Sequence, residues 1–108
     1  MFNLSHRINR TIIKFSYRFG ISRLWSMPKK LAIDPTNHCD LECPLCPTGL
    51  GDKTVDRGLM KLDQFKPIID RMGKWLQSVD MYSWGEPLLN KSLVTMIRYA
   101  TKTHKIRT

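Results

Sequence analysis

The sequence predicts an α/β fold in which short parallel strands alternate with amphipathic helices. Two short apolar runs, at residues 31–33 and 79–82, each end at a turn that contains proline or glycine. An apolar repeat of helical spacing follows each run, at about residues 63–75 and 90–102. Because strands that alternate with helices pair in parallel through right-handed crossovers, we expect two successive βα units.

The length of the chain limits how much of such a fold it can contain. A complete eight-unit barrel needs about 250 residues, whereas this chain has 108. Two units cannot close a barrel or cover both faces of a sheet. We therefore expect residues 30–108 to be the first two βα units of a larger α/β domain that is truncated here, with residues 105–108 approaching a third strand. Residues 1–29 are expected to form a separate arm and linker.

The arm is predicted to be a basic amphipathic helix over residues 3–19. One face is apolar, with residues at steps of three or four: Leu4, Ile8, Ile12, Phe15 and Phe19. Another face is basic: Arg7, Arg10, Lys14 and Arg18. Gly20 is the expected end of the helix. We favour docking of the apolar face against the barrel; the alternative is an interfacial helix on anionic lipid, which would make the protein peripheral to a membrane.

Each later element has a local signal. Residues 31–33 are predicted to be a buried strand, which the Asp-Pro pair at residues 34–35 terminates. A loop without periodicity follows to about residue 61, and a loop this long inside a compact domain is usually functional or disordered. Asp63 is the expected N-cap of the next helix. The second strand stops at the turn WGEP, residues 84–87.

Composition and charge exclude several classes of protein. With 42% apolar and 25% charged residues, the chain is not fully disordered, collagen-like or a disulfide-rich scaffold. No apolar run approaches the roughly 20 residues that span a bilayer, and the first residues do not resemble a signal peptide, so we expect a cytoplasmic protein. The net charge is +9, but residues 1–30 hold seven basic residues and no acidic one. This distribution argues against a nucleic-acid-binding domain, in which the folded surface itself is basic.

All three cysteines lie in one short segment, CDLECPLC at residues 39–46. Three thiolates in one loop suit a soft metal centre, such as an iron–sulfur cluster, zinc or copper(I). A disulfide framework fits poorly because the count is odd and the spacing is tight. A four-iron cluster usually takes four cysteines, so three would leave one iron open for a ligand other than protein. An open iron implies catalysis.

The spacing CxxxCxxC after a first strand resembles the signature of the radical S-adenosylmethionine (SAM) superfamily. The resemblance covers about residues 30–102 and implies that Cys39, Cys43 and Cys46 bind a [4Fe–4S] cluster whose fourth iron is chelated by SAM. It further implies reductive cleavage of SAM to a 5′-deoxyadenosyl radical, which abstracts hydrogen from a substrate. The substrate would be a small molecule or a peptide, and the electron donor a protein such as flavodoxin or ferredoxin.

The turn after the second strand is similar to the Gly-Gly-Glu-like element of the same family, which contacts the SAM amino group. The resemblance implies that Gly85 offers backbone groups and Glu86 a charged acceptor to the methionyl ammonium. Ser83 and Trp84 would flank this pocket, with Trp84 in the place of the first glycine. Leu45 matches a hydrophobic position whose backbone lies near adenine.

The lead-in DPTNHC at residues 34–39 and the Gly-Glu-Pro-Leu version of the turn resemble the branch that often carries a C-terminal SPASM extension. The implied fold is a partial (βα)6 TIM-type barrel, of which this chain would be the N-terminal portion, preceded by the basic amphipathic helix. In parallel α/β folds, the loops at the C-terminal ends of the strands share one face. We therefore expect the segment that holds the cysteines and the turn at Gly85 and Glu86 to converge.

Two other interpretations of the cysteines remain open. One is a small zinc-binding structural or adaptor module, with His38 or His104 as the fourth ligand of a Cys₃His site. The other is an inactive truncated product, because later βα units would supply the substrate contacts and half of the SAM pocket. No acid–base catalyst is assigned, since Asp40 and Glu42 are better explained as solvated or capping charges.

Overall fold

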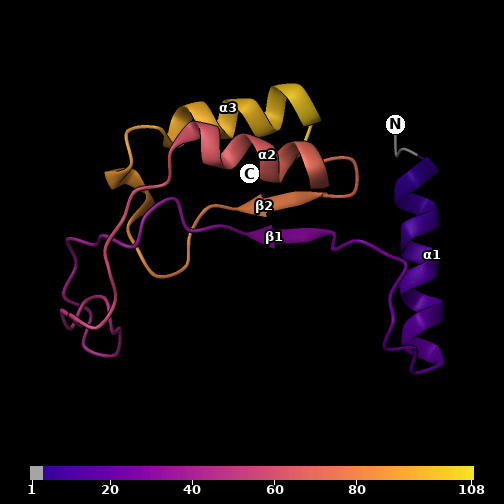
Figure 1. Ribbon diagram of the computed structural model, residues 1–108, viewed down its shortest axis with the longest axis horizontal. Helices are drawn as coiled ribbons and strands as arrows, with labels where there is room; N and C mark the ends of the chain where they lie inside the picture. Colours follow the sequence, from indigo (N-terminus) through magenta and orange to yellow (C-terminus); the bar gives the residue numbers. More distant parts are fainter. Residues whose placement is uncertain (1–3) are drawn as a thin grey trace.

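The computed structural model describes residues 4–108, and the side chains from residue 6 onward. Its elements are, in chain order, α1 (Leu4–Arg18), β1 (Lys30–Ala32), α2 (Leu62–Met72), β2 (Ser78–Asp80), the 3-10 helix η1 (Pro87–Leu89) and α3 (Leu93–His104). Figure 1 shows α2 and α3 together over one face of the two strands, whereas α1 stands apart, beyond the N-terminal end of β1. None of the helices in this described part of the chain has the length and apolar character needed to cross a bilayer.

The two strands pair in parallel, as the alternation of strands and helices predicts. Leu31 of β1 lies opposite Val79 of β2. On its other edge β2 begins a further parallel pairing, because the N–H of Val79 donates to the carbonyl of Arg107 at 2.8 Å. The predicted approach of residues 105–108 to a third strand is therefore confirmed, and β2 lies between β1 and this segment.

An apolar core lies between the sheet and the two helices that cover it. Its most deeply buried side chains come from α2, β2, α3 and the final segment: Phe65, Ile69, Val79, Met96, Ala100 and Ile106. Full burial of a large apolar side chain such as Phe65 stabilises a fold by about 1.5–3 kcal/mol. The helical repeats predicted for residues 63–75 and 90–102 are thus confirmed as core-facing stripes.

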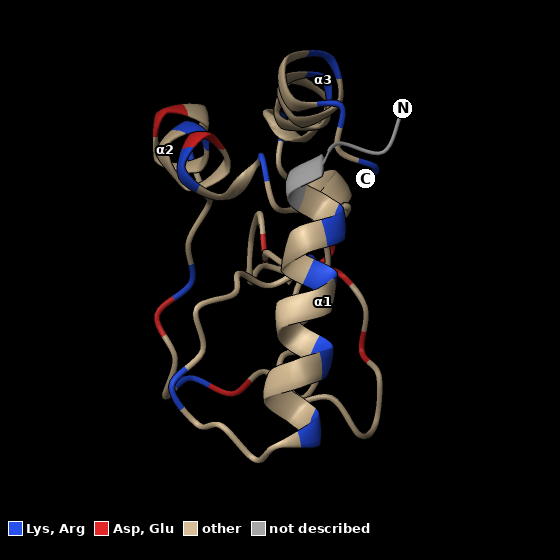
Figure 2. Cartoon of the chain, turned by 90° about the vertical axis from the view of Figure 1, so that its right-hand side faces the viewer, with Lys and Arg blue, Asp and Glu red and all other residues tan. Residues whose placement is uncertain are grey.

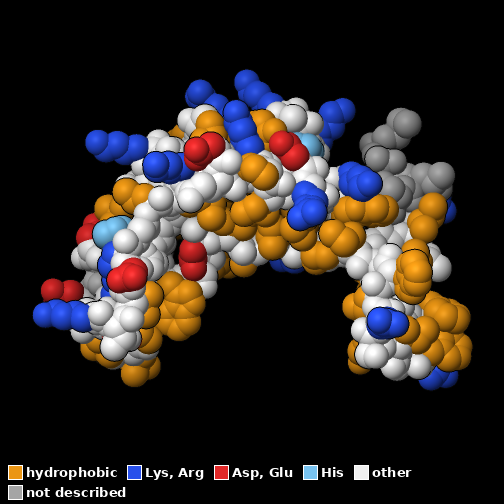
Figure 3. All heavy atoms as spheres, in the orientation of Figure 1, with side chains coloured by type: hydrophobic (Ala, Val, Ile, Leu, Met, Phe, Trp, Pro, Cys, Tyr) orange, Lys and Arg blue, Asp and Glu red, His pale blue; other side chains and the backbone are white. Residues whose placement is uncertain are grey.

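The opposite face of the strands is polar. Side chains alternate between the two faces along a strand, and Leu31 and Val79 point toward the helices. Lys30 and Asp80 therefore point the other way, where the Nζ of Lys30 lies 4.0 Å from the Oδ2 of Asp80. Figure 1 shows no helix across this face among the described residues, and Figure 3 shows the molecule hollowed on this side.

The predicted N-cap of α2, Asp63, is wrong. Lys61 is the N-cap residue, and its N–H donates to the Oε1 of Gln64 at 2.8 Å. The side-chain amide of Gln64 therefore closes the first turn, which leaves Asp63 inside the helix. At its other end α2 stops at Met72, short of the predicted end, in a turn that starts at Gly73.

Helix α3 also differs from its predicted bounds. It begins at Leu93 rather than near residue 90, because the Oδ1 of Asn90 accepts from the N–H of Ser92 at 2.9 Å and forms a local turn. Along its exposed edge α3 is tied to α2. Asp70 of α2 accepts from the hydroxyl of Tyr99 at 2.6 Å and lies 2.8 Å from the Nε2 of His104.

Helix α1 ends at Arg18, and Gly20, the predicted stop, lies just beyond it with a φ of +60° that forms a left-handed cap. The N–H of Ile21 donates to the carbonyl of Ser16 at 2.9 Å, as in a Schellman motif. The side chain of Asn9 then binds both the N–H and the carbonyl of Met27. The linker thus runs back along the face of α1 that carries Asn9 and Ser16.

Within the described residues the apolar face of α1 does not dock against the two βα units, and its predicted docking against a complete barrel stays a prediction. Ile8, Phe15 and Phe19 are 50%, 56% and 64% exposed. Leu4, which the pattern assigns to the same face, lies outside the described side chains. The side chain of Asn9 binds the linker on the opposite, polar face of the helix, and the apolar face is left toward solvent.

Candidate metal and cofactor site

The cysteines lie in a long irregular segment, residues 36–61, which we call the cysteine loop. The N–H of Met60 donates to the carbonyl of Pro35 at 2.8 Å. The side-chain amide of Asn90, which is only 5% exposed, donates to the carbonyls of Pro35 (2.7 Å) and Met60 (2.9 Å). One buried side chain therefore holds both ends of the loop beside the start of α3.

The second half of the loop folds back over the residues that lead into the first cysteine. Asn37 donates through Nδ2 to the carbonyl of Asp56 and accepts through Oδ1 from the N–H of Gly58. Arg57 donates to the carbonyls of Asn37 (2.7 Å) and Asp52 (3.1 Å). The backbone before the first cysteine is therefore held by the loop itself.

The three thiols are free, with Cys39 and Cys46 half-buried and Cys43 exposed. A tight turn joins the last two, since the N–H of Cys46 donates to the carbonyl of Cys43 at 3.1 Å. Gly49 packs so closely on this turn that a β-carbon there would lie 2.6 Å from the backbone nitrogen of Cys43. A larger residue at position 49 would therefore displace the backbone that presents Cys43.

The structure does not draw these thiols into a closed set of ligands. Within residues 4–108, no three side chains of His, Cys, Asp or Glu are grouped so that they could hold a metal ion. Metal ligands must be deprotonated, and the binding of a metal is coupled to the folding of its site. The donor set itself fits an iron–sulfur cluster, since three soft ligands share one irregular loop. The assignment of Cys39, Cys43 and Cys46 as ligands stays a prediction.

The thiol of Cys46 lies in surroundings that favour its ionised form. The backbone N–H of Gly49 lowers the pKa of Cys46, and Thr48 and the charge of Arg57 lower this pKa further. Desolvation acts in the opposite direction without reversing the shift. The thiolate is the form that binds metals and reacts as a nucleophile, so these neighbours prepare Cys46 for either role.

The turn after β2 lies directly beside the residues that lead into the first cysteine. The N–H of Glu86 donates to the carbonyl of His38 at 2.8 Å. Gly85 faces Thr36 so closely that a β-carbon at Gly85 would overlap the carbonyl oxygen of Thr36. The predicted convergence of the two motifs at the C-terminal ends of the strands is confirmed for the backbone.

The groups of this turn already have partners in the chain. The Oε1 of Glu86 accepts from the N–H of Leu88 at 3.0 Å and so caps η1. The N–H of Trp84 donates to the Oδ1 of Asp34 at 3.0 Å, which ties the turn to the end of β1. One carboxylate oxygen of Glu86 is therefore committed to the turn itself, and a ligand would use the other oxygen or displace the cap.

A cavity of about 480 Å³ lies between the two motifs. It is lined by Asp34, Asn37, Pro47, Thr48, Asp52, Val55, Arg57 and Trp84. Trp84 comes from the turn after β2, whereas Pro47 and Thr48 directly follow the last cysteine. A second hollow of about 450 Å³ includes Cys39 in its lining. Of the other residues predicted to flank SAM, Leu45 is 95% exposed and Ser83 is exposed.

Sequence reasoning missed the residues that shape this site, namely Asn37, Arg57 and Asn90. Asn37 had a usable signal, because it belongs to a polar run directly after a buried strand, where functional loops begin in parallel α/β folds. Arg57 and Asn90 had none. Their partners lie far away in the sequence, so no local pattern distinguishes them from ordinary surface residues.

Comparison with known proteins gives one informative similarity. No family model matches the chain, and no solved structure matches it. The chain is 27% identical over 85 residues to the PqqA peptide cyclase of Rhodopseudomonas palustris. The matched residues are 77% of this chain but only 22% of that relative, so the chain spans less than a quarter of its length. The relative is a radical SAM enzyme, and the similarity supports a relationship of this chain to that family.

Proposed function

We propose that this chain is the part of a radical SAM enzyme that binds a [4Fe–4S] cluster and SAM. Cys39, Cys43 and Cys46 would hold the cluster, and the turn at Gly85 and Glu86 would receive the amino group of SAM. When bound, the cluster and SAM supply a 5′-deoxyadenosyl radical that removes hydrogen from a substrate. The similarity to a radical SAM peptide cyclase and the CxxxCxxC spacing support the same assignment.

The observation that carries the proposal is the hydrogen bond between the N–H of Glu86 and the carbonyl of His38, at 2.8 Å. His38 directly precedes Cys39. The contact therefore puts the turn that resembles a SAM-binding element next to the first cysteine, although the two motifs are far apart in the sequence. A cofactor held by both the cysteine loop and this turn would need this proximity.

The residues of the chain would divide the work between binding and positioning. The donors around Cys46 favour its thiolate form. The absence of a side chain at Gly85 allows the turn to lie against the backbone of Thr36. Glu86 would place a carboxylate oxygen opposite the ammonium of SAM, as an acceptor of charge-assisted hydrogen bonds.

We also propose that the two βα units form the first part of a partial (βα)6 barrel. Both helices cover the same face of the strands, a third parallel pairing starts at Arg107, and the opposite face presents Lys30 and Asp80. That polar face would line the interior. The name of the relative records a peptide as its substrate, so a peptide is the first substrate class to test for this chain, ahead of a small molecule.

Anaerobic reconstitution with iron and sulfide tests the proposal. The chain is expected to bind about four irons and four sulfides, and the EPR spectrum of the reduced protein should change when SAM is added. Cys43→Ser should lose the cluster, whereas His38→Ala, which removes a neighbouring exposed side chain, should keep it. Binding of one zinc that both variants lose would establish a Cys₃His module instead, and a chain that takes up neither metal would contradict the proposal.

A further inference from the structure

The outward face of α1 combines exposed apolar and basic side chains. Ile8, Phe15 and Phe19 are each at least half exposed. The rings of Phe15 and Phe19 pack on each other, with centroids 4.5 Å apart. Lys14 and Arg18 are exposed on the same helix. In Figure 2 the Lys and Arg positions line one edge of α1, and no acidic position appears along it.

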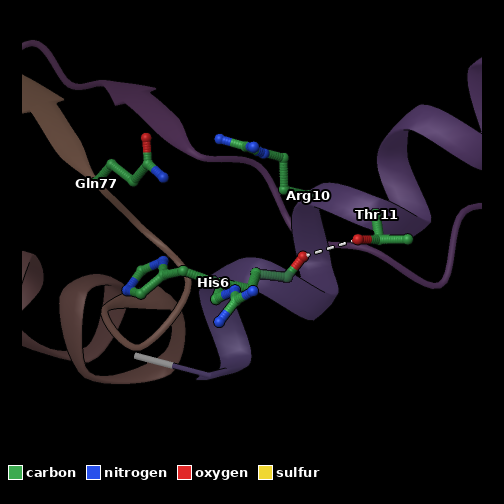
Figure 4. Close-up of a pocket in the computed structure, with 5 residues that line it drawn as sticks. His6, Arg10, Thr11 and Gln77 are labelled. Atoms are coloured by element: carbon green, nitrogen blue, oxygen red, sulfur yellow. Dashed lines mark hydrogen bonds between the residues drawn. The ribbon is translucent and has the colours of Figure 1, made fainter. Parts of the chain in front are cut away.

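The other faces of α1 lie against other parts of the chain. One face, with the buried Asn9 and Ser16, is covered by the linker. Another face borders a cavity of about 430 Å³ between α1 and the residue before β2. Figure 4 shows His6 and Arg10 extending from α1 toward Gln77 across this space. Figure 3 shows hydrophobic side chains on the side of α1 that faces away from the sheet, whereas Arg7 and Arg10 of the basic edge line the cavity.

The linker adds further exposed apolar and basic side chains to this surface. Leu24 is 60% exposed and Trp25 is 91% exposed, and Arg23 beside them is exposed as well. Because the linker runs back along α1, these side chains lie next to the helix rather than beyond it. No acidic residue occurs in the chain before Asp34. The exposed side chains of α1 and the linker thus form a surface that includes apolar, aromatic and positively charged groups.

We propose that this surface binds the face of an anionic lipid bilayer, with α1 lying in the interface and the βα units in water. A basic amphipathic helix of this kind buries its apolar side chains at the boundary of headgroups and acyl chains. Its Lys and Arg side chains then meet lipid phosphates, and its aromatic rings occupy the headgroup level. The proposal rests on the surface of α1 and the linker, and is independent of the proposed function of the cysteine loop.

The mixture of groups favours lipid over nucleic acid as the occupant. A nucleic acid would neutralise Lys14 and Arg18 but would leave Ile8, Phe15 and Phe19 in water. An anionic bilayer satisfies both sets of groups at once, because it offers negative charge above an apolar layer. The charge complementarity and the aromatic side chains beside it therefore point to the same partner.

Vesicle flotation tests the proposal with the whole chain. Binding is expected to vesicles of equal parts phosphatidylcholine and phosphatidylglycerol, to weaken at high salt, and to be absent with phosphatidylcholine alone. Phe15→Ala with Phe19→Ala should lower the partition coefficient by at least about tenfold. Lys14→Gln with Arg18→Gln should lower it by about fivefold for each charge removed.

Matched variants on α3 and directly before it provide the control. Val94→Ala removes an exposed apolar side chain, and Lys91→Gln with Arg98→Gln removes two exposed charges, yet none of them should change vesicle binding. Circular dichroism of every variant would show that α1 still folds. Failure to float with anionic vesicles would overturn the proposal, and so would binding that ignores the two phenylalanines. If the charge variants Lys14→Gln with Arg18→Gln and Lys91→Gln with Arg98→Gln lose binding equally, the binding depends only on net charge. That result would also overturn the proposal.

Discussion

Gly85 and Thr36 lie in backbone contact, and the hydrogen atom of Gly85 occupies the space that a side chain would need. The contact joins the turn after β2 to the lead-in of the cysteine loop. No positive φ is involved, since Gly85 does not belong to the left-handed residues of the chain. The requirement for glycine is therefore one of space, and the two strand ends can meet only because this position lacks a β-carbon.

Gly85→Ala is accordingly expected to separate the turn from the cysteine loop. Clashes of this kind typically cost about 1–3 kcal/mol, because backbone rather than a flexible side chain must move. Hydrogen exchange at the N–H of Glu86, which now binds His38, should become faster. Gly58→Ala is the control, because a β-carbon at Gly58 meets nothing within 4 Å. Unchanged protection of Glu86 in the Gly85 variant would contradict the close approach.

Asn90→Ala is expected to release both ends of the cysteine loop. The carbonyl of Met60 would lose its bond from Asn90, and the carbonyl of Pro35 would keep only its bond from the N–H of Met60. A buried polar group that is left unsatisfied costs about 1–3 kcal/mol. The denaturation midpoint in urea should fall, and proteases should cut the loop faster. Lys91→Ala, at an exposed neighbouring position, should leave both measurements unchanged. Equal protease resistance of wild type and Asn90→Ala would show that the loop is held by other contacts.

Acid should weaken the link between α2 and α3. The hydroxyl of Tyr99 lowers the pKa of Asp70, and His104 lowers this pKa further. A carboxyl whose pKa is lower in the folded state contributes stability at a pH above its unfolded value, and this contribution is lost as the pH falls through the folded value. Thermal unfolding followed against pH should show the loss below about pH 4.

Asp70→Asn is the variant that isolates this effect. The midpoint temperature of thermal unfolding of this variant should lie below that of the wild type near neutral pH. The two midpoint temperatures should approach each other as the pH falls. Asp56→Asn, which changes an exposed carboxyl in the cysteine loop, should run parallel to the wild type at every pH. A constant difference between wild type and Asp70→Asn would rule out ionisation of Asp70 as the cause.

Cys46 should react with an alkylating agent at a lower pH than an ordinary thiol. The N–H of Gly49 lowers the pKa of Cys46, and Thr48 contributes through both its N–H and its hydroxyl. Because the thiolate is the reactive form, the rate should rise through this lowered pKa as the pH increases. In a chain with Cys39→Ser and Cys43→Ser, Thr48→Val should move the pH midpoint upward. If the pH midpoint of alkylation lies at or above 9.0 in the chain that keeps Thr48, the lowered pKa of Cys46 is disproved.

The elements with regular periodicity could be predicted from the sequence, because core-facing residues such as Phe65 and Met96 repeat at helical spacing. The N-cap could not, since Gln64 reaches back to Lys61 through a side-chain bond that competes with the more typical signal at Asp63. The exposure of the apolar face of α1 within the described residues could not be predicted for a similar reason. Asn9 binds the linker through polar bonds, and this local partner decides the orientation of the helix.

For the candidate site, the general placement was predictable and its detail was not. Parallel strands bring their C-terminal ends to one edge of the sheet. This arrangement places Glu86 near the segment before Cys39, independently of the conformation of the cysteine loop. The conformation of the loop depends on Arg57 and Asn90, whose partners are distant in the sequence. The grouping of the thiols also depends on a metal that the sequence only implies.

Because β1 pairs with β2 across the whole cysteine loop and α2, this pairing belongs to the long-range contacts that are expected to form late in folding. Closing an intervening chain of this length costs about 3 kcal/mol in entropy before any strand contact forms. The segment from α2 to α3 has only short connections and can collapse first, so β1 is expected to join it last.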